Sequence, residues 1–306
     1  MDSGLNQVGV VGMGLMGSGI AQVAATRGLR TVAVDVTEEL VKRGLDGIKH
    51  SLTRMARAHD QSQGRKGVSR AESDATLQRL TASTRLEDIL DCDIVIEAIP
   101  ENEDGKTRLY ARLGQIGYTK LLVSNTSSIS ITRLGSAFSR PDRFMGMHFM
   151  NPVPVQKGCE LIRGILTSEE TFQAVVAFSK ELGKEPILAE DEPGFGINRM
   201  LVPFLTEAIR VVEQGIMTCE DADKMTLCAG HAMGPITTVD YVGLDTTLAI
   251  GYILEKELGE AYRPPQLLKK LVSSGFLGLK SGKGFYIWEN GHKAGVNPCV
   301  ARYRRG

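Results

Sequence analysis

The chain has no net charge, because 36 lysine and arginine side chains balance 36 aspartate and glutamate side chains. A neutral chain has no general attraction for polyphosphate backbones or anionic lipid surfaces, so neither nucleic-acid binding nor membrane binding is expected. Hydrophobic residues make up 42% of the sequence and charged residues 24%, a composition that excludes global disorder. The 306 residues are enough for about two domains.

Cysteine is scarce, and the five cysteines are widely separated, with no C-x-x-C pair. An odd number of scattered cysteines disfavours a disulfide framework or a zinc site, so no metal is predicted and a reducing compartment is favoured. The acidic start, residues 1–4 (MDSG), has none of the arginines of a transit peptide, which favours the cytoplasm. The mitochondrial matrix is the alternative, since a processed chain would look the same.

Long hydrophobic runs are nearly absent. The one uncharged stretch that resembles a membrane span or a signal peptide runs from Leu5 to Thr26, and no basic side chain precedes it. Five glycines fall within eleven positions of this stretch, at Gly9, Gly12, Gly14, Gly17 and Gly19. Lipid-spanning helices rarely concentrate glycine in this way and signal peptides have a basic lead-in, so neither is expected.

The first 190 residues alternate short β-branched runs with longer stretches of helical periodicity, a pattern typical of strand-helix-strand units and a parallel sheet. The expected strands are Gln7 to Val11, Thr31 to Val34, Asp93 to Ala98, Leu121 to Ser124, Arg143 to Met147 and Cys159 to Arg163. Apolar spacing near 3.6 residues predicts helices over Asp35 to Arg57 and Thr107 to Ile116. The polar stretch from His59 to Asp74 is expected to be a solvated excursion between two helices.

The pattern changes after Glu190. The segment DEPGFGINR contains helix breakers, and beyond it helical patterns cover Arg199 to Gln214 and Cys219 to Ala229 with few strand signals. We therefore place a domain boundary near Asp191, followed by a mostly helical domain of about 115 residues that is large enough for its own core. The basic end ARYRRG is too short to indicate more than a solvated tail.

Gly12, Gly14 and Gly17 form a G-x-G-x-x-G motif directly after an expected strand and at the start of an expected helix. Such glycines allow a tight turn, close approach of a pyrophosphate and close packing of helix against strand, with the helix N-terminus facing the phosphates. Asp35, twenty-one positions after Gly14, can accept hydrogen bonds from ribose hydroxyls and would repel a 2′-phosphate, which favours NAD over NADP. The alternative is a glycine-rich turn that binds nothing. The sequence thus predicts an α/β fold, with a Rossmann-type NAD-binding domain over residues 1–190 and a mainly helical domain over residues 191–306.

His148 lies just past an expected strand, in GMHFMNPVP, and Glu160 lies twelve residues later near the start of the next strand. The intervening NPVPV turns the chain, which would bring the imidazole and the carboxylate together. A carboxylate beside an imidazole fixes the ring tautomer and favours the protonated ring, which suits proton transfer. A histidine that serves only as a structural hydrogen-bonding group is the alternative.

At these residues the chain resembles the L-3-hydroxyacyl-CoA dehydrogenases over nearly its whole length. The matching segments occur in the family's order and spacing: VGMGLMGSGIAQVAA, VIEAIPEN, SNTSS, HFMNPVP, DEPGFGINR, GHAMGP, VGLD, PPQLLKKLV and LGLKSGKGFY. The resemblance implies NAD-dependent oxidation of an (S)-3-hydroxyacyl-CoA to the 3-oxoacyl-CoA, or the reverse, in fatty-acid or butanoate metabolism. It also implies a homodimer that forms through the region from Arg199 onward.

The resemblance also implies roles for particular residues. His148 is the expected general acid/base, and Glu160 is the carboxylate that orients it. Ser127 of SNTSS would touch the substrate oxygen, and Asn198 of PGFGINR would polarise the thioester-side carbonyl. Turn or helix-capping roles are the alternatives for both. Cofactor contacts map to Glu101, Lys106 and Asn125.

The chain departs from the family where the CoA nucleotide is expected to bind. Members commonly place a lysine in the helix after the second strand, and Ala58 takes its place here. Ser51 matches the family pattern, and Arg54 and Arg57 are the nearest cations. The alternative is that these charged residues only form a solvent-exposed face of the helix.

Two other classes of protein stay open. One is a related β-hydroxyacid or sugar-acid dehydrogenase, and HFMNPVP together with Glu160 argues against it. The other is a non-catalytic NAD-binding protein built on the same fold. The presence of both His148 and Glu160 argues against that class.

Overall fold

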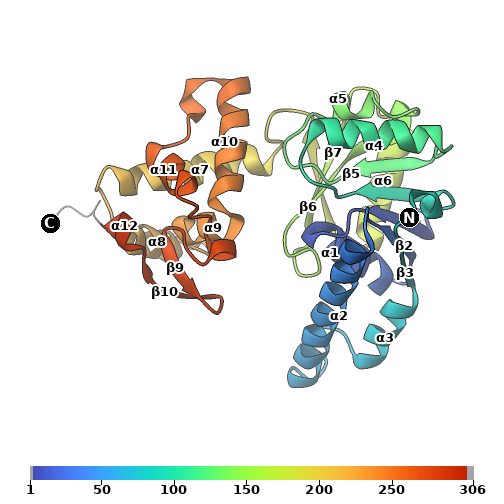
Figure 1. Ribbon diagram of the computed structural model, residues 1–306, viewed down its shortest axis with the longest axis horizontal. Helices are drawn as coiled ribbons and strands as arrows, with labels where there is room; N and C mark the ends of the chain where they lie inside the picture. Colours follow the sequence, from blue (N-terminus) through green and yellow to red (C-terminus); the bar gives the residue numbers. More distant parts are fainter. Residues whose placement is uncertain (1–2, 302–306) are drawn as a thin grey trace. The chain divides into compact units, whose positions relative to one another are not determined.

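The computed structural model describes residues 3–301, which divide into two compact units at the peptide bond between Glu192 and Pro193 (Figure 1). Of the basic tail expected at residues 301–306, residues 302–306 lie outside the described residues. Within residues 3–301 no helix is long and apolar enough to cross a membrane.

The first unit is built on an eight-stranded sheet in the order β3-β2-β1-β4-β5-β6-β7-β8 (Figure 1). All pairings from β3 to β6 in that order are parallel, whereas β7 runs antiparallel to β6, and β8 is parallel to β7. The prediction of a parallel sheet is therefore correct up to β6 and wrong for β7, because residues 150–157 are too short for a parallel crossover. The strands are β1 Gln7–Val11, β2 Arg30–Val34, β3 Leu80–Ser83, β4 Ile94–Glu97, β5 Leu121–Ser124, β6 Phe144–Phe149, β7 Gly158–Arg163 and β8 Glu185–Glu190.

The two edge strands, β3 and β8, were not predicted. Strand β3 is only four residues long and none of its residues is fully buried, so it has no apolar run. Strand β8 has the sequence EPILAE, in which a proline and two glutamates mask the strand signal, and four of its six positions are exposed. Short half-exposed edge strands carry the weakest hydrophobic pattern of any sheet element.

Eight helical segments of the described residues accompany this sheet. The helix predicted to start at Asp35 starts three residues later, as α2. The Thr37 side chain accepts a hydrogen bond from Leu40 N, so the helix begins at Glu38 and leaves Asp35 in the preceding loop. The predicted excursion from His59 to Asp74 is wrong at both ends, because α2 continues to Gln61 and α3 begins at Arg70. The segments are α1 Leu15–Thr26, α2 Glu38–Gln61, α3 Arg70–Gln78, η1 Leu86–Ile89, α4 Glu103–Gln115, α5 Ile131–Gly135, η2 Pro141–Arg143 and α6 Glu169–Glu181.

A capping box marks the start of α3. Ser69 Oγ accepts from Glu72 N, and the Glu72 carboxylate accepts from Ser69 N. This S-x-x-E spacing is a helix start signal that the sequence contains and that the predicted excursion overlooked.

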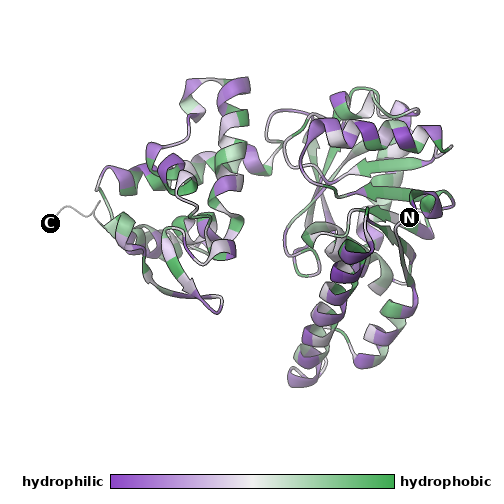
Figure 2. Ribbon diagram, in the orientation of Figure 1, coloured by the Kyte–Doolittle hydropathy of each residue, from purple (hydrophilic) through white to green (hydrophobic). Residues whose placement is uncertain are grey.

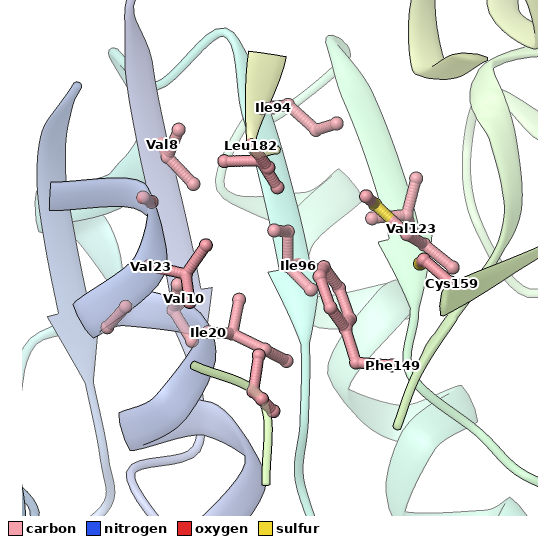
Figure 3. Packing of buried hydrophobic residues seen from close by; sticks show 14 of the residues in the cluster. Val8, Val10, Ile20, Val23, Ile94, Ile96, Val123, Phe149, Cys159 and Leu182 are labelled. Carbon is pink, nitrogen blue, oxygen red and sulfur yellow. The ribbon is translucent and has the colours of Figure 1, made fainter. Parts of the chain in front are cut away.

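The core of this unit lies between the sheet and helices α1, α2 and α6. Figure 3 shows Ile20 and Val23 of α1 gathered with Val10 and Ile96 of the sheet. Figure 2 shows the strands as hydrophobic, whereas α2 is hydrophilic over most of its surface. On β6, Met145, Met147 and Phe149 join this core. Since side chains alternate along a strand, Phe144, Gly146 and His148 share the opposite face, where the Phe144 ring lies 5.2 Å from the ring of Tyr110 in α4.

The second unit is mainly helical, and a two-stranded antiparallel hairpin that was not predicted packs into its core. The fully buried members of this core include Ile209, Leu244, Leu268 and Phe285. The elements are α7 Ile197–Glu213, α8 Cys219–Cys228, α9 Pro235–Val242, α10 Leu244–Leu258, η3 Glu260–Tyr262, α11 Gln266–Ser273, η4 Leu279–Ser281, β9 Tyr286–Glu289, β10 His292–Val296 and α12 Pro298–Ala301.

A buried carboxylate attaches the hairpin to α9. Asp240, which is fully buried, accepts hydrogen bonds from Phe285 N at 2.8 Å, Tyr286 N at 2.9 Å and Trp288 Nε1 at 2.7 Å. Burial raises the pKa of Asp240 to about 6, although these hydrogen bonds favour the ionised form. The carboxyl group therefore binds its proton more tightly in the folded chain than in the unfolded chain, where the ordinary value is 3.8.

This difference predicts a pH dependence for the second unit. The contribution of Asp240 to the free energy of unfolding should be greatest below pH 4 and should be lost as the pH rises through about 6, a change of about 3 kcal/mol. Trp288 is the only tryptophan in the chain, so its fluorescence reports this site directly. We expect the emission of the native protein to titrate with a midpoint near pH 6.

The variant Asp240→Asn supplies the control, because an amide does not titrate in this range. Its tryptophan emission should be flat between pH 5 and 7.5. Equal titration curves for the two proteins would show that another group is responsible.

Candidate active site

The glycine motif forms a tight loop between β1 and α1. Gly12 adopts φ +98°, and its amide donates to Val34 O at 2.8 Å. A Cβ at Gly17 would lie 1.7 Å from Gly12 O, so only glycine allows the first turn of α1 to pack on the loop. The motif therefore has the conformation that the sequence predicts for a dinucleotide-binding turn.

The start of α1 is open toward a ligand. A Cβ at Gly14, the N-cap residue, would meet no atom of the described residues within 4 Å, and no side chain among them caps the helix. Acidic residues are absent from the first turn. An uncapped helix N-terminus behind a glycine loop favours a phosphate group, so these residues fit the pyrophosphate of NAD.

Asp35 lies at the end of β2, beside the glycine loop. Its carboxylate accepts from Met13 N and from Val36 N, each at 2.7 Å. Asp35 thus anchors the loop and also places a negative charge next to it. A carboxylate in this place fits ribose hydroxyls and opposes a 2′-phosphate.

His148 and Glu160 are direct neighbours across the antiparallel pair β6 and β7. His148 Nδ1 lies 2.8 Å from Glu160 Oε2, and the two residues are only 9% and 1% exposed. The contact predicted from NPVPV is therefore present. With Nδ1 engaged by a carboxylate, the ring is held in one orientation and one tautomer.

The SNTSS loop follows β5 and binds to the end of β6. Asn125 Oδ1 accepts from Phe149 N at 2.9 Å, which fixes the backbone immediately after His148. Thr126 Oγ1 donates to Glu101 Oε1 at 2.7 Å, and Ser127 N and Oγ donate to the same oxygen at 2.9 and 3.2 Å. Ser127 is thus held close to the loop that precedes α4.

Glu101 receives these bonds beside a buried lysine, since Lys106 Nζ lies 3.4 Å from its Oε2. Partial burial raises the pKa of Glu101, but the Lys106 ammonium and the hydrogen bonds outweigh this effect and hold the pKa below its usual range. Lys106 is 1% exposed, and its main partner is Glu97, at 2.6 Å.

Glu97 was missed from the sequence. It ends β4, is fully buried, and also accepts from Ile99 N at 2.8 Å, Tyr110 Oη at 2.5 Å and Ser124 Oγ at 2.6 Å. This carboxylate joins β4, β5 and α4 beneath the predicted cofactor residues. Its only sequence signal is an acidic residue at the end of the buried strand in VIEA.

The residues expected to meet the CoA nucleotide lie on α2. Ser51 is half-buried, whereas Arg54 and Arg57 are exposed. Neither arginine has an ion-pair partner within residues 3–301. The three residues follow one another at intervals of three positions, so they lie about one helical turn apart along α2.

Asn198 belongs to the second unit. It lies in the first turn of α7 and is 8% exposed. The first unit thus contains His148, Glu160, Ser127 and all predicted cofactor residues. In the described part of the chain no group of three or more His, Cys, Asp or Glu side chains is placed to hold a metal ion.

The fold and site define a class of protein, namely a two-domain NAD-binding protein with a buried histidine-carboxylate pair at the carboxyl end of its sheet. Residues 7–192 match the 3-hydroxyacyl-CoA dehydrogenase NAD binding domain, and residues 194–288 match the 3-hydroxyacyl-CoA dehydrogenase C-terminal domain. The chain belongs to the 3-hydroxyacyl-CoA dehydrogenase family.

Individual relatives agree with this assignment. The probable 3-hydroxybutyryl-CoA dehydrogenase of Deinococcus radiodurans is 47% identical over 281 residues, which cover 91% of this chain and 98% of the relative. The mitochondrial hydroxyacyl-coenzyme A dehydrogenase of Homo sapiens is 43% identical, over 93% of this chain and 92% of the relative. The crystal structure of (S)-3-hydroxybutyryl-CoA dehydrogenase PaaH1 from Ralstonia eutropha superposes with a TM-score of 0.86 at 42% identity, covering 94% of this chain and 100% of that chain.

The carboxylate of Asp35 predicts the choice of cofactor. We expect NAD to bind at least about tenfold more tightly than NADP, a difference of about 1.4 kcal/mol or more. Replacing Asp35 with alanine or arginine should narrow this difference, as measured by titration of each cofactor. Equal affinities for NAD and NADP in the unmodified protein would contradict the prediction.

A matched variant, Asp35→Asn, separates charge from anchoring. The amide keeps one acceptor oxygen for Met13 N but removes the negative charge. It should therefore gain NADP affinity while losing less NAD affinity than Asp35→Ala.

Proposed function

We propose that this protein catalyses the reversible NAD-dependent oxidation of (S)-3-hydroxyacyl-CoA to 3-oxoacyl-CoA. The observation that carries the proposal is the buried pair of His148 and Glu160, in a member of this family and at the sheet edge where the dinucleotide loop lies. In open α/β sheets, the carboxyl ends of parallel strands are where ligands bind.

His148 is the general acid/base in this proposal. Glu160 accepts from Nδ1–H, so Nε2 is the nitrogen that takes the proton of the C3 hydroxyl during oxidation and returns it during reduction. The imidazolium that forms is stabilised by the adjacent carboxylate, which is 1% exposed and poorly screened by water. When bound, NAD supplies the hydride acceptor for C3.

Neutral donors complete the proposed substrate site. Ser127 would hydrogen-bond the C3 oxygen, and Asn198 would polarise the thioester-side carbonyl. Neutral groups steady an oxygen whose charge changes during the reaction without trapping it as an ion. Ser127 Oγ donates to Glu101 Oε1 at 3.2 Å, so its hydroxyl would rotate to donate to a substrate oxygen.

The cofactor side of the site consists of Glu101, Lys106 and Asn125. Asn125 accepts a hydrogen bond from the backbone directly after His148, so a cofactor contact that moved Asn125 would also move the catalytic histidine. Lys106 is held by Glu97, which keeps its ammonium at the strand end. Together these residues would receive the nicotinamide half of NAD.

The CoA nucleotide is assigned to α2. Ser51 matches the family's serine, and Ala58 stands at the position of the family's lysine. Arg54 and Arg57, the nearest cations, would bind the phosphates in its stead. Exposed guanidinium groups without ion-pair partners in the described residues are suited to phosphate, which they bind in a bidentate manner.

The proton-transfer pair generates a quantitative prediction. His148→Gln should lower kcat by about 10²- to 10⁴-fold, the range typical of a lost general base, while NAD affinity stays nearly unchanged. Glu160→Gln should lower kcat in the same direction, because the amide no longer stabilises the imidazolium. Steady-state oxidation of NADH with acetoacetyl-CoA measures both effects.

The double variant decides whether the two residues act as a unit. The increase in activation free energy of the double variant, calculated from kcat, should be much smaller than the sum of the increases in the two single variants. Strict additivity would require the pairing to be abandoned as a catalytic device.

The same assay separates the alternative functions. A non-catalytic NAD-binding protein would bind NADH without consuming it. A β-hydroxyacid or sugar-acid dehydrogenase would accept the free acid but not the CoA thioester. Turnover of acetoacetyl-CoA therefore supports the proposed reaction alone.

The second unit is proposed to form a symmetric homodimer. Several large apolar side chains of this unit are exposed, including Met200 at 70% and Phe204 at 37%, which are four residues apart on one face of α7. Exposed apolar groups in such numbers favour association with a second copy. The others are Ile216, Met225, Leu227, Met233, Tyr241, Val242 and Tyr252.

Light scattering tests the assembly. We expect about twice the 33.2 kDa mass of one chain at micromolar concentration. Phe204→Asp should shift the mass toward one chain, whereas Ile165→Asp, at an exposed apolar residue of the first unit, should not. A wild-type mass near 33.2 kDa would contradict the dimer.

The metabolic setting follows from the substrate class. An enzyme that interconverts 3-hydroxyacyl-CoA and 3-oxoacyl-CoA serves fatty-acid or butanoate metabolism. We assign it to the cytoplasm, with the mitochondrial matrix as the alternative.

A further inference from the structure

Lys184, which follows α6, is a buried cation without an acidic partner. It is 7% exposed, and within residues 3–301 no carboxylate oxygen lies within ion-pair distance of Nζ. Burial lowers its pKa below the usual range of a lysine. An ammonium is expensive to bury without a counterion, so its neighbours indicate what it does.

Those neighbours are two backbone carbonyls of a single turn. Lys184 Nζ donates to Val153 O at 2.5 Å and to Gln156 O at 2.7 Å. Both belong to residues 150–157, the connection that carries the chain from β6 to β7. One side chain therefore closes the turn that sets the register of His148 against Glu160.

The same turn also packs on the helix of the dinucleotide loop. Val153 is 2% exposed and belongs to the core, and a Cβ at Gly19 of α1 would lie only 3.0 Å from Val153 Cβ. The carbonyl of Val153 is thus held by Lys184 while its side chain rests on α1. The turn connects the proton-transfer pair to the element that would hold the cofactor pyrophosphate.

We propose that Lys184 is a positioning residue, which fixes the catalytic pair relative to α1 and so sets the approach of the substrate carbon to the nicotinamide. The proposal rests on the function proposed above. Lys184 is assigned no proton-transfer role, because its ammonium is committed to the carbonyls of Val153 and Gln156. An error of about 1 Å between reacting groups is enough to slow a reaction by about 100-fold.

The test is Lys184→Met in the full-length enzyme, since methionine keeps an unbranched apolar stem of nearly the same length but removes the donors. Single-turnover oxidation of (S)-3-hydroxybutyryl-CoA at saturating NAD, followed by NADH absorbance, separates two effects. The rate constant reports the geometry of hydride transfer, and the amplitude reports the fraction of folded enzyme. We expect the rate constant to fall about 10- to 100-fold, with the amplitude and NAD affinity nearly unchanged.

Three further variants serve as controls. Lys184→Arg keeps a cationic donor and should restore part of the rate. Lys180→Met, at an exposed lysine of α6, should leave the rate unchanged. In Gly19→Ala the added Cβ would lie 3.0 Å from Val153 Cβ and would displace the turn from α1. This variant should slow the same step, so it provides a test even if Lys184→Met fails to fold.

Two results would overturn the proposal. A wild-type rate constant in Lys184→Met with only a smaller amplitude would make Lys184 a purely structural residue. A wild-type rate constant in Gly19→Ala would show that the contact between the turn and α1 does not affect the reaction. Absence of turnover in the unmodified enzyme would instead refute the proposed function, and this proposal with it.

Discussion

The reversal of chain direction between β6 and β7 is the constraint on which the site depends. In a parallel crossover, a helix would join the strands of His148 and Glu160, and no short turn would set the register between them. The tight return through residues 150–157 places them directly opposite each other, so that a hydrogen bond of 2.8 Å forms between buried groups. Because β7 is antiparallel to β6 and β8 is parallel to β7, both strands run opposite to the other strands of the sheet. One short connection thus determines both the topology of the sheet and the chemistry of its edge.

Three buried charges in this molecule are compensated in three different ways. Lys106 is paired with the carboxylate of Glu97, which three further donors also bind. Among the described residues, Lys184 is bound by two carbonyl oxygens, and Asp240 is bound by three N–H donors. Removing one partner from any of these groups leaves a desolvated charge, which costs more than the bond itself contributes. Each charge therefore holds a turn, a strand end or a hairpin in a single arrangement.

Much of this structure was predictable because its signals are local. The glycine turn, the pairing of His148 with Glu160 and the helical character of the second unit all follow from short patterns. The sequence did not reveal strands β3 and β8, whose half-exposed residues form no apolar run, or the hairpin of β9 and β10. Glu97 and Lys184 were missed for a different reason: each is a single polar residue whose role depends on partners contributed by other elements of the fold. Position in sequence alone does not distinguish such a residue from a solvated one.

The outer strand of the sheet has a consequence for solubility. Strand β8 lies at the edge and exposes Ile187 and Leu188, at 50% and 60%. An open edge with apolar side chains is a template for strand addition and for fibrous aggregation. Pro186 removes one of the N–H donors that such an addition needs, and glutamates at both ends of the strand add repulsion between copies. The residues that hide β8 from sequence-based recognition are thus the same ones that keep it from recruiting another chain.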